Sequence, residues 1–421
     1  MFHVLSFTIF IFLLLLMIKS KVKCLLVMMV VQPTFDVFRI VGSIKSWPLC
    51  ACIMMLYTYS TKKRYPSFPF KIPFYFLFIS YLLSFLLGEY NGFTAMVPFL
   101  GNLFLTILLW RLFEPTISNL RFLIILGLCY YLVLSLYGLY EGVTFSYPFT
   151  EWIESMDYSR RHGTLGEYER FGFARANSFA IYCTYFANAC GIGLVFMTFL
   201  MMYSNKIVVP KLFVLFFVFI MLGGVLISGD RSAMLMTSIF MLSLIPAMKS
   251  NKKWVMLAIL VCIAIYIQLS EYFDAIYFAL AHTEEVSGSN IDMRVGQLDA
   301  ALESFWESPI WGHGINAVGE IKEHKNLGLK GGESYIFELL VNYGVVGIMA
   351  FLFLIISSII TLIHKRAIII VPILIGFMTY NILALPVNIL YIFPFIVILY
   401  KTIIAERRTT SNHLLCKKTE K

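Results

Sequence analysis

Two arginines of the sequence are candidates for holding an anion at a membrane surface. Arg231 lies in Ser228-Gly229-Asp230-Arg231-Ser232-Ala233, between two apolar segments. An arginine at that depth is costly unless it is paired or functional. Arg294 is the one arginine of the polar stretch 271–333. Guanidinium groups suit phosphates because they bind two oxygens at once. The plainer alternatives are a salt bridge from Arg231 to Asp230 or contact with lipid headgroups, and an ordinary solvated position for Arg294.

Two carboxylates stand where the same polar stretch enters the next apolar segment. Glu333 follows Gly331-Gly332, and Glu338 lies about one and a half helical turns further on. A carboxylate can accept the proton of a hydroxyl nucleophile when exclusion of water raises its pKa. Alternatively, Glu333 is a helix N-terminal acid favoured by the helix dipole.

A third group of residues provides further candidates for substrate contacts. Arg170 and Arg175 belong to a basic stretch that runs from Arg160 to Asn177, which is also explained as a patch for lipid headgroups. His313 lies in Trp311-Gly312-His313-Gly314, a turn in which glycines allow the backbone to approach a ligand closely. The sequence contains no phosphate-binding P-loop, no HExxH motif and no DxD pair, and its eight cysteines form no CxxC. We therefore expect neither a metal nor a cofactor.

The elements that position these residues are membrane helices. Of the 421 residues, 60% are hydrophobic and 14% are charged. Soluble domains carry about 45–50% apolar and about 25% charged residues, so a soluble enzyme is excluded. Apolar runs of the length of a membrane span predict an all-α polytopic membrane protein with twelve or thirteen transmembrane helices. Pro33, Asp36 and Arg39 interrupt the second run, so the count stays open. The predicted spans lie near 4–18, 24–42, 46–60, 72–88, 93–110, 122–140, 176–203, 208–227, 232–248, 254–270, 334–363, 367–384 and 386–404.

The charge distribution predicts how these spans are oriented. The short connectors on one side and the C-terminal tail hold 22 of the 33 basic residues and three of the 24 acids. Because positive loops stay in the cytoplasm, this side and the tail 405–421 are predicted to be cytoplasmic. The net charge of +9 is thus a topology signal rather than a sign of nucleic-acid binding.

Two polar loops, 141–175 and 271–333, then lie on the outer side of a single integral membrane domain, 1–421. Within the second loop, Ser289-Asn290 can cap a helix from about Ile291 to Glu307. Leu298, Leu302 and Phe305 would form its apolar face. Pro309 would end it.

Four motifs in this order resemble the O-antigen ligase/polymerase family of bacterial membrane proteins. They are Ser228-Gly-Asp-Arg231-Ser-Ala; Arg294-Val-Gly-Gln297 followed by Ala300-Ala301 and Pro309-Ile-Trp-Gly312-His-Gly314; Glu333-Ser-Tyr; and Asn342-Tyr-Gly344-Val-Val-Gly347. The likeness is good over roughly 220–350, and Arg170 to Asn177 resembles an upstream element of the family.

The resemblance implies a metal-independent membrane glycosyltransferase of GT-C-like fold, whose large helical periplasmic loop covers a lipid-facing cavity. It implies that Arg231 and Arg294, and further Arg170 and Arg175, bind the pyrophosphate of an undecaprenyl-linked glycan. Family ligases carry a histidine near the return of the loop into the membrane, where this sequence has Glu333. His313 and His324 do not match that position.

This departure favours a polymerase of lipid-linked oligosaccharide repeats at the periplasmic face of the inner membrane, producing O-antigen, capsule or exopolysaccharide. Glu333, Arg231 and Arg294 would be catalytic, and Arg170, Arg175, His313 and Glu338 would bind substrate. A chain-length regulator protein would be a further partner. One alternative is an O-antigen ligase that transfers glycan to lipid A-core. Another is a transporter or flippase of the same lipid-linked glycan, which predicts charged residues buried in mid-span.

Overall fold

The structure is a computed structural model of a largely helical chain. It describes residues 2–41, 44–60, 65, 67–90, 93–156, 169–170, 173–180, 182–203, 209–244, 291–324, 334–383 and 388–419. Within these residues the strands are two short antiparallel pairs, β1 (Arg39–Val41) with β2 (Ile44–Lys45) and β3 (Glu169–Arg170) with β4 (Phe173–Ala174). The described part of the chain is therefore all-α apart from these pairs, as predicted.

The helices of the N-terminal half follow the predicted apolar segments. They are α1 (Phe2–Lys19), α2 (Lys21–Phe35), α3 (Ser46–Ser60), α4 (Lys71–Leu87), α5 (Phe93–Leu112) and α6 (Ile117–Thr144). The second predicted segment, 24–42, is interrupted as its sequence suggested. Pro33 is accommodated inside α2, the helix ends at Phe35, and Asp36 caps it.

The second half adds both long and short helices. They are α7 (Pro148–Met156), α8 (Cys183–Tyr203), α9 (Lys211–Ile227), α10 (Arg231–Leu242), α13 (Ile291–Glu307), α14 (Ala317–His324), α15 (Tyr335–Glu338), the π-helical turn η2 (Leu339–Tyr343), α16 (Gly344–His364), the 3-10 turn η3 (Ile368–Ile370), α17 (Val371–Leu383), the 3-10 turn η4 (Ile389–Ile392) and α18 (Phe393–Thr419). The predicted span 254–270 lies outside the described residues.

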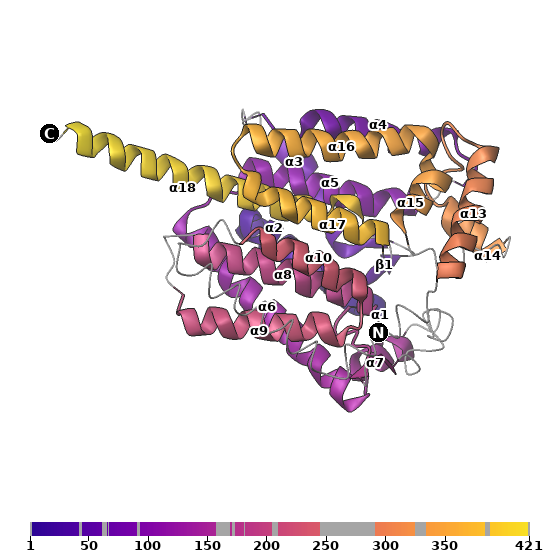
Figure 1. Ribbon diagram of the computed structural model, residues 1–421, viewed down its shortest axis with the longest axis horizontal. Coiled ribbons are helices and arrows are strands. Elements are labelled where there is room, and N and C mark those ends of the chain that lie inside the picture. Colours follow the sequence, from indigo (N-terminus) through magenta and orange to yellow (C-terminus); the bar gives the residue numbers. More distant parts are fainter. Residues whose placement is uncertain are drawn as a thin grey trace.

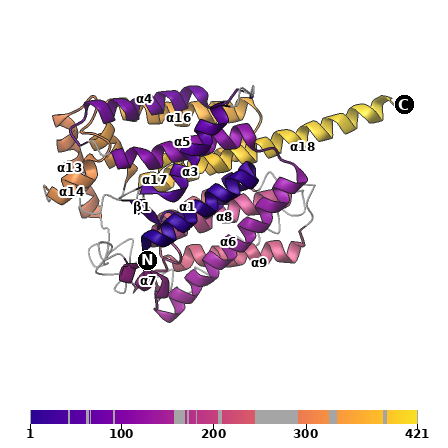
Figure 2. The ribbon, with the colours of Figure 1, turned by 180° about the vertical axis from the view of Figure 1, so that it is seen from behind.

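The helices form one bundle with two different ends. Helices α6, α8 and α9 pack together, α16 packs on α4, and α3 packs on α5. Helix α10 joins the two halves because it packs on both α8 and α17. Figure 1 shows α13, α14 and α15 at one end of this bundle, while α18 extends beyond the opposite end, and Figure 2 shows the same arrangement from behind.

The outside of the bundle is apolar, as expected of helices that contact lipid. On α16, Val345, Met349, Ile356 and Ile360 are exposed, whereas small residues such as Gly347 face inward. Close contact through small residues is typical of membrane helix packing. Among the described residues, four helical stretches are long and apolar enough to cross a membrane, namely Ile117–Thr144, Cys183–Met202, Tyr335–His364 and Ile389–Arg407. The chain is thus consistent with a polytopic membrane protein, and its twelve or thirteen spans stay a prediction.

One predicted span begins later than expected. Residues 176–180 and 182 are not helical, and α8 starts at Cys183. The cause is Glu141 near the end of α6, since its Oε2 accepts hydrogen bonds from the backbone N–H groups of Asn177 at 2.9 Å and Ser178 at 2.6 Å. Ser178 also adopts a left-handed φ of 53°. A backbone held in this way cannot continue as a helix.

Helix α13 has the predicted bounds, but the predicted apolar face is wrong for two of its three residues. Leu298 and Leu302 are 39% and 36% exposed, whereas Phe305 is buried. The contacting face is centred on Ala301, which is fully buried against η2 and its neighbours. The small alanine allows the helix to approach η2 closely, so the two leucines point elsewhere.

Candidate active site at one end of the bundle

The turn before Arg231 is held by its own side chains. Gly229 has a φ of 63°, and Asp230 is the N-cap of α10. Asp230 Oδ1 accepts from the backbone N–H of Ser232 at 2.9 Å and of Ala233 at 3.1 Å. This capping fixes Arg231 as the first residue of α10, at the end of the helix where an anion is favoured.

The segment predicted to be the first outer loop is attached to the same turn through Arg175. Its Nε donates to the carbonyl oxygen of Ser228 at 3.2 Å, and the next residue, Ala176, donates its backbone N–H to Ile227 O at 3.4 Å. The side chain of Arg175 therefore contacts a residue that lies three positions before Arg231 in the chain. Arg175, 56 positions before Arg231 in the sequence, thus contacts the turn that leads to Arg231 at one corner of the bundle.

A tyrosine supports this corner from the other side. Tyr147 Oη donates to the carbonyl oxygen of Arg175 at 3.2 Å. Burial raises the pKa of Tyr147 to about 12, nearby Glu141 and Cys183 add to the increase, and Arg175 opposes it. The hydroxyl consequently stays protonated at neutral pH and remains a donor to Arg175.

A second group of contacts locks two of the family-like motifs together. The backbone N–H of His313 donates to Val341 O at 2.8 Å, and that of Gly314 donates to Asn342 O at 3.2 Å. In the other direction, Val345 N–H donates to Pro309 O at 2.8 Å. We call the segments Pro309–Gly314 and Asn342–Gly347 together the interlock.

Glycines make the interlock possible. Gly312 and Gly344 have φ values of 71° and 59°, which side chains rarely allow. A Cβ on Gly312 would lie 2.5 Å from the backbone nitrogen of Tyr343, and one on Gly344 would lie 2.6 Å from Pro309 O. The side chain of Asn342 completes the contact, since its Oδ1 accepts from Val318 N–H at 2.9 Å.

His313 is buried inside this arrangement. Its Nε2 lies 2.7 Å from Ser304 O and 3.7 Å from Glu307 Oε2. Because a carbonyl oxygen only accepts, Nε2 carries the proton, and Nδ1 is the ring nitrogen left for a ligand. The geometry gives His313 a structural task whether or not it contacts substrate.

Tyrosines gather where the chain passes from α15 into η2. Tyr335 Oη and Tyr81 Oη lie 3.0 Å apart, and the ring of Tyr81 stacks on Tyr343 with centroids 4.3 Å apart. Glu338, three residues after Tyr335, is half-buried at the start of η2. π-Helical turns such as η2 occur frequently at functional sites.

The first turn of α8 is joined to the turn before Arg231 by Tyr380 of α17. The carbonyl oxygen of Thr184 accepts a 2.7 Å hydrogen bond from Tyr380 Oη, which also lies 3.5 Å from Asp230 Oδ2. The start of α8 is thus a polar region beside the turn before Arg231.

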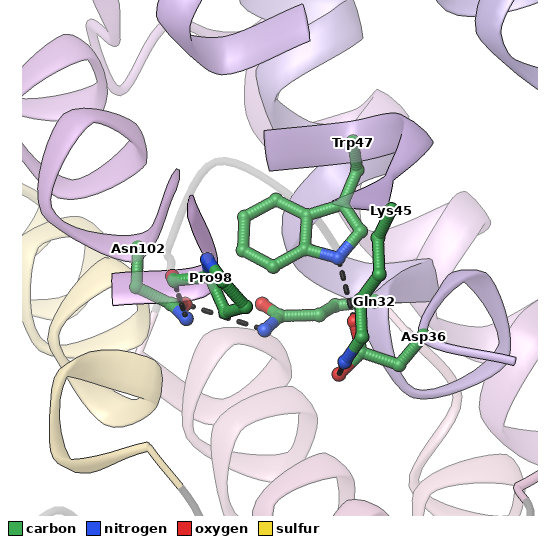
Figure 3. A network of polar contacts seen from close by, with 6 residues as sticks. All are labelled: Gln32, Asp36, Lys45, Trp47, Pro98 and Asn102. Atoms are coloured by element: carbon green, nitrogen blue, oxygen red, sulfur yellow. Dashed lines mark hydrogen bonds and ion pairs between the residues drawn. The ribbon is translucent and has the colours of Figure 1, made fainter. Parts of the chain in front are cut away.

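Figure 3 shows the polar contacts around Asp36. Its Oδ1 accepts from Trp47 Nε1 at 2.6 Å, and its Oδ2 pairs with Lys45 Nζ at 3.1 Å. Nearby, Gln32 Nε2 donates to Asn102 Oδ1 at 3.3 Å. The contacts link α2, the β1–β2 pair, α3 and α5, so the carboxylate of Asp36 anchors this hairpin.

The structure describes some predicted site residues more fully than others. Arg175, His313 and Glu338 are described with their side chains, and each lies at the end of the bundle that carries α13 and α15. Arg170, Arg231 and Arg294 are described by backbone alone, in β3, α10 and α13. Glu333 lies outside the described residues.

Several residues of this region were missed by reasoning from the sequence. Tyr81, Tyr335 and Tyr380 occur in apolar segments, where tyrosine is common, and Glu141 stands at the start of a predicted loop. The signal that could have indicated Glu141 is an acid at the end of an apolar helix just before a basic stretch. In the part of the chain that the structure describes, no three histidine, cysteine or acidic side chains lie close enough to hold a metal ion.

The fold is consistent with a polytopic helical membrane protein, and at this end of the bundle an arginine-bearing segment is held against the turn that begins α10. Residues 216–352 match the family model described as O-antigen ligase. The match confirms the resemblance to the O-antigen ligase/polymerase family and covers Arg231, Arg294, His313, Glu333 and Glu338. The members of this family are glycosyltransferase-like enzymes that act on lipid-linked glycans. No curated protein matches the chain.

Proposed function

We propose that this protein polymerises undecaprenyl-pyrophosphate-linked oligosaccharide repeats at the periplasmic face of a bacterial inner membrane. The observation that carries the proposal is the hydrogen bond from Arg175 to Ser228, which joins the first outer loop to the turn before Arg231. Two segments that resemble pyrophosphate-binding elements thus share one corner, and the sequence has Glu333 where the ligases of the family carry a histidine.

The reaction would be a direct transfer between two lipid-linked glycans. A hydroxyl oxygen of the acceptor's terminal sugar attacks the anomeric carbon of the donor's reducing-end sugar. The bond from that carbon to the pyrophosphate oxygen breaks, and undecaprenyl pyrophosphate leaves with the electron pair. Glu333 takes the proton of the attacking hydroxyl.

The arginines would stabilise the leaving group. Negative charge develops on the pyrophosphate as the bond breaks, and fixed guanidinium groups near it lower the energy of the transition state. At the N-terminus of α10, where Arg231 lies, the helix dipole would add to the stabilisation of the bound anion. Arg294, Arg170 and Arg175 would contribute further contacts, and no metal ion is required in this scheme.

A first experiment tests the arginines with purified protein in vesicles that contain a lipid-linked repeat. We expect Arg231→Lys and Arg294→Lys to lose most polymerising activity while the protein accumulates normally, because lysine lacks the planar fork. Arg121→Lys, at an exposed position in the second turn of α6, is the matched control and should keep full activity. Full activity of Arg294→Lys would instead indicate a generic surface charge.

A second experiment tests the base and separates polymerase from ligase. Glu333→Gln should abolish chain growth and still bind the donor, because the arginines remain. If Glu333 only favours the helix terminus, the nearly isosteric glutamine should leave long chains on a gel. Adding lipid A-core as acceptor tests for a ligase. A ligase would transfer preformed polymer to the lipid A-core without increasing the length of the polymer. The flippase alternative has no support from the family match.

A further inference from the structure

A groove opens on the side of the bundle away from the Arg231 corner. It has a volume of about 1070 Å³ and runs between α4 on one side and α3 and α5 on the other. Helix α4 packs on α16, and α3 packs on α5, so the groove follows the boundary between these two helix pairs. Its walls are mainly aromatic and aliphatic and include Phe78, Leu82, Phe85, Leu100 and Phe104.

The charged residues of the groove lie at one end. Lys71 is the first residue of α4, and Arg111 is in the last turn of α5. Lys71 is exposed, and Arg111 is half-buried. Arg111 donates to Tyr59 Oη at 2.8 Å and its guanidinium lies 4.2 Å from the centre of the same ring. A guanidinium has five N–H donors, so this contact leaves others for a phosphate.

This cationic end is remote from the proposed active site. The other end of α4 leads to Gly88, which lies against Gly314 of the interlock, as a Cβ added there would be 2.5 Å from Gly314 N. Beside that end of the groove, Tyr81 stacks on Phe99 with centroids 3.9 Å apart and joins α4 to α5. A donor lipid whose pyrophosphate sits at the Arg231 corner would therefore not place its phosphates on Lys71 and Arg111.

The dimensions and chemistry fit a membrane phospholipid. From Lys71 to Phe85 the rise of α4 is about 21 Å, which is longer than one leaflet of a hydrocarbon core of ~30 Å. The cationic end belongs to the basic connectors that the charge distribution predicts to be cytoplasmic. Anionic lipids are concentrated in that leaflet and attract lysine and arginine near its surface.

We propose that this groove is a binding site for an anionic phospholipid, with its acyl chain along α4 and its phosphate on Lys71 and Arg111. Tyr59 and Tyr65 line the same end and suit the interface between headgroup and hydrocarbon. The site is separate from the proposed polymerase chemistry. It gives the protein a preference for the lipid composition around it.

The experiment titrates the purified full-length protein with phosphatidylglycerol and with phosphatidylethanolamine of identical acyl chains, and counts bound lipid by native mass spectrometry. The wild type should prefer phosphatidylglycerol. The double variant Lys71→Gln/Arg111→Gln should lose about 30-fold of this preference, at about fivefold for each cation near the surface. The control Arg121→Gln/Lys211→Gln removes the same charge from exposed positions outside the groove and should keep the preference.

A filling variant tests the acyl part independently. Leu82→Trp should reduce binding of both lipids, because it occupies the groove rather than changing its charge. Equal binding of both headgroups by the wild type, or equal loss in the control double variant, would overturn the proposal. Displacement of phosphatidylglycerol by undecaprenyl pyrophosphate would also overturn it, because the groove would then be a donor site. None of these measurements depends on polymerising activity, so they stand apart from the test of the proposed function.

Discussion

Replacing Gly312 by alanine tests whether the interlock holds the segment 291–324 on the bundle. Gly312 has a φ of 71°, and an added Cβ would lie 2.5 Å from the backbone nitrogen of Tyr343. Atoms that close must move apart. Because the added Cβ is attached to the backbone and the nitrogen of Tyr343 belongs to it, the backbone itself has to shift. The segments Pro309–Gly314 and Asn342–Gly347 would therefore separate.

The cost has two parts. A left-handed conformation costs an alanine about 1–2 kcal/mol. Separation of the segments weakens the hydrogen bonds from His313 N to Val341 O and from Gly314 N to Asn342 O, each worth about 1 kcal/mol. Together these give a loss of about 3–4 kcal/mol, which shifts the equilibrium between docked and undocked segment by about 100- to 1000-fold.

The matched control is Gly296→Ala in the same segment. Gly296 is exposed within α13, and an added Cβ meets no atom within 4 Å. Alanine should stabilise this helix by up to about 1 kcal/mol. Thermal unfolding of the detergent-purified protein, followed by size-exclusion chromatography, should show a clearly lower midpoint for Gly312→Ala and an unchanged or higher one for Gly296→Ala. Equal midpoints for Gly312→Ala and the wild type would refute the reasoning about the interlock.

Two further predictions concern the first outer loop and the orientation of the chain. Glu141→Leu should destabilise the protein by about 2–4 kcal/mol in the same unfolding assay, because the backbone N–H groups of Asn177 and Ser178 lose their acceptor. Glu141→Gln keeps an acceptor oxygen and should lose less stability. Equal losses of stability in the two variants would mean that these hydrogen bonds are not the cause. A reporter active only in the periplasm should be active when fused after Asn326 and silent after Asn412, and the reverse pattern would place the proposed site on the wrong side of the membrane.

Much of the helical architecture was predictable because it depends on local patterns. The apolar runs are bounded by charges and turn residues, and they match most helix ends within a few positions. The helix Ile291–Glu307 was predicted from a capping pair and a proline, and both signals are local. The membrane class follows from composition alone.

The errors arise where distant contacts decide the local structure. The start of α8 depends on Glu141, which lies 36 residues before Asn177 in the sequence. The buried face of α13 depends on η2, where close approach favours Ala301 over the larger leucines. The pair of Tyr81 and Tyr335 joins residues 254 positions apart, and no local signal marks it.

The structure also separates two tasks that the family-like motifs combine. Gly312, Asn342 and Gly344 hold backbone to backbone in the interlock, and Asp230 caps α10. These residues fix where the segments that carry the motifs lie, whereas an arginine at the start of a capped helix can act on a ligand. A motif seen only as a sequence cannot distinguish these tasks, because both restrict residue type equally. Substitution of the residues that hold the backbone in place should therefore reduce both stability and activity. Substitution of Arg231 should reduce activity alone. This difference would assign the chemistry to the arginine rather than to the turn that carries it.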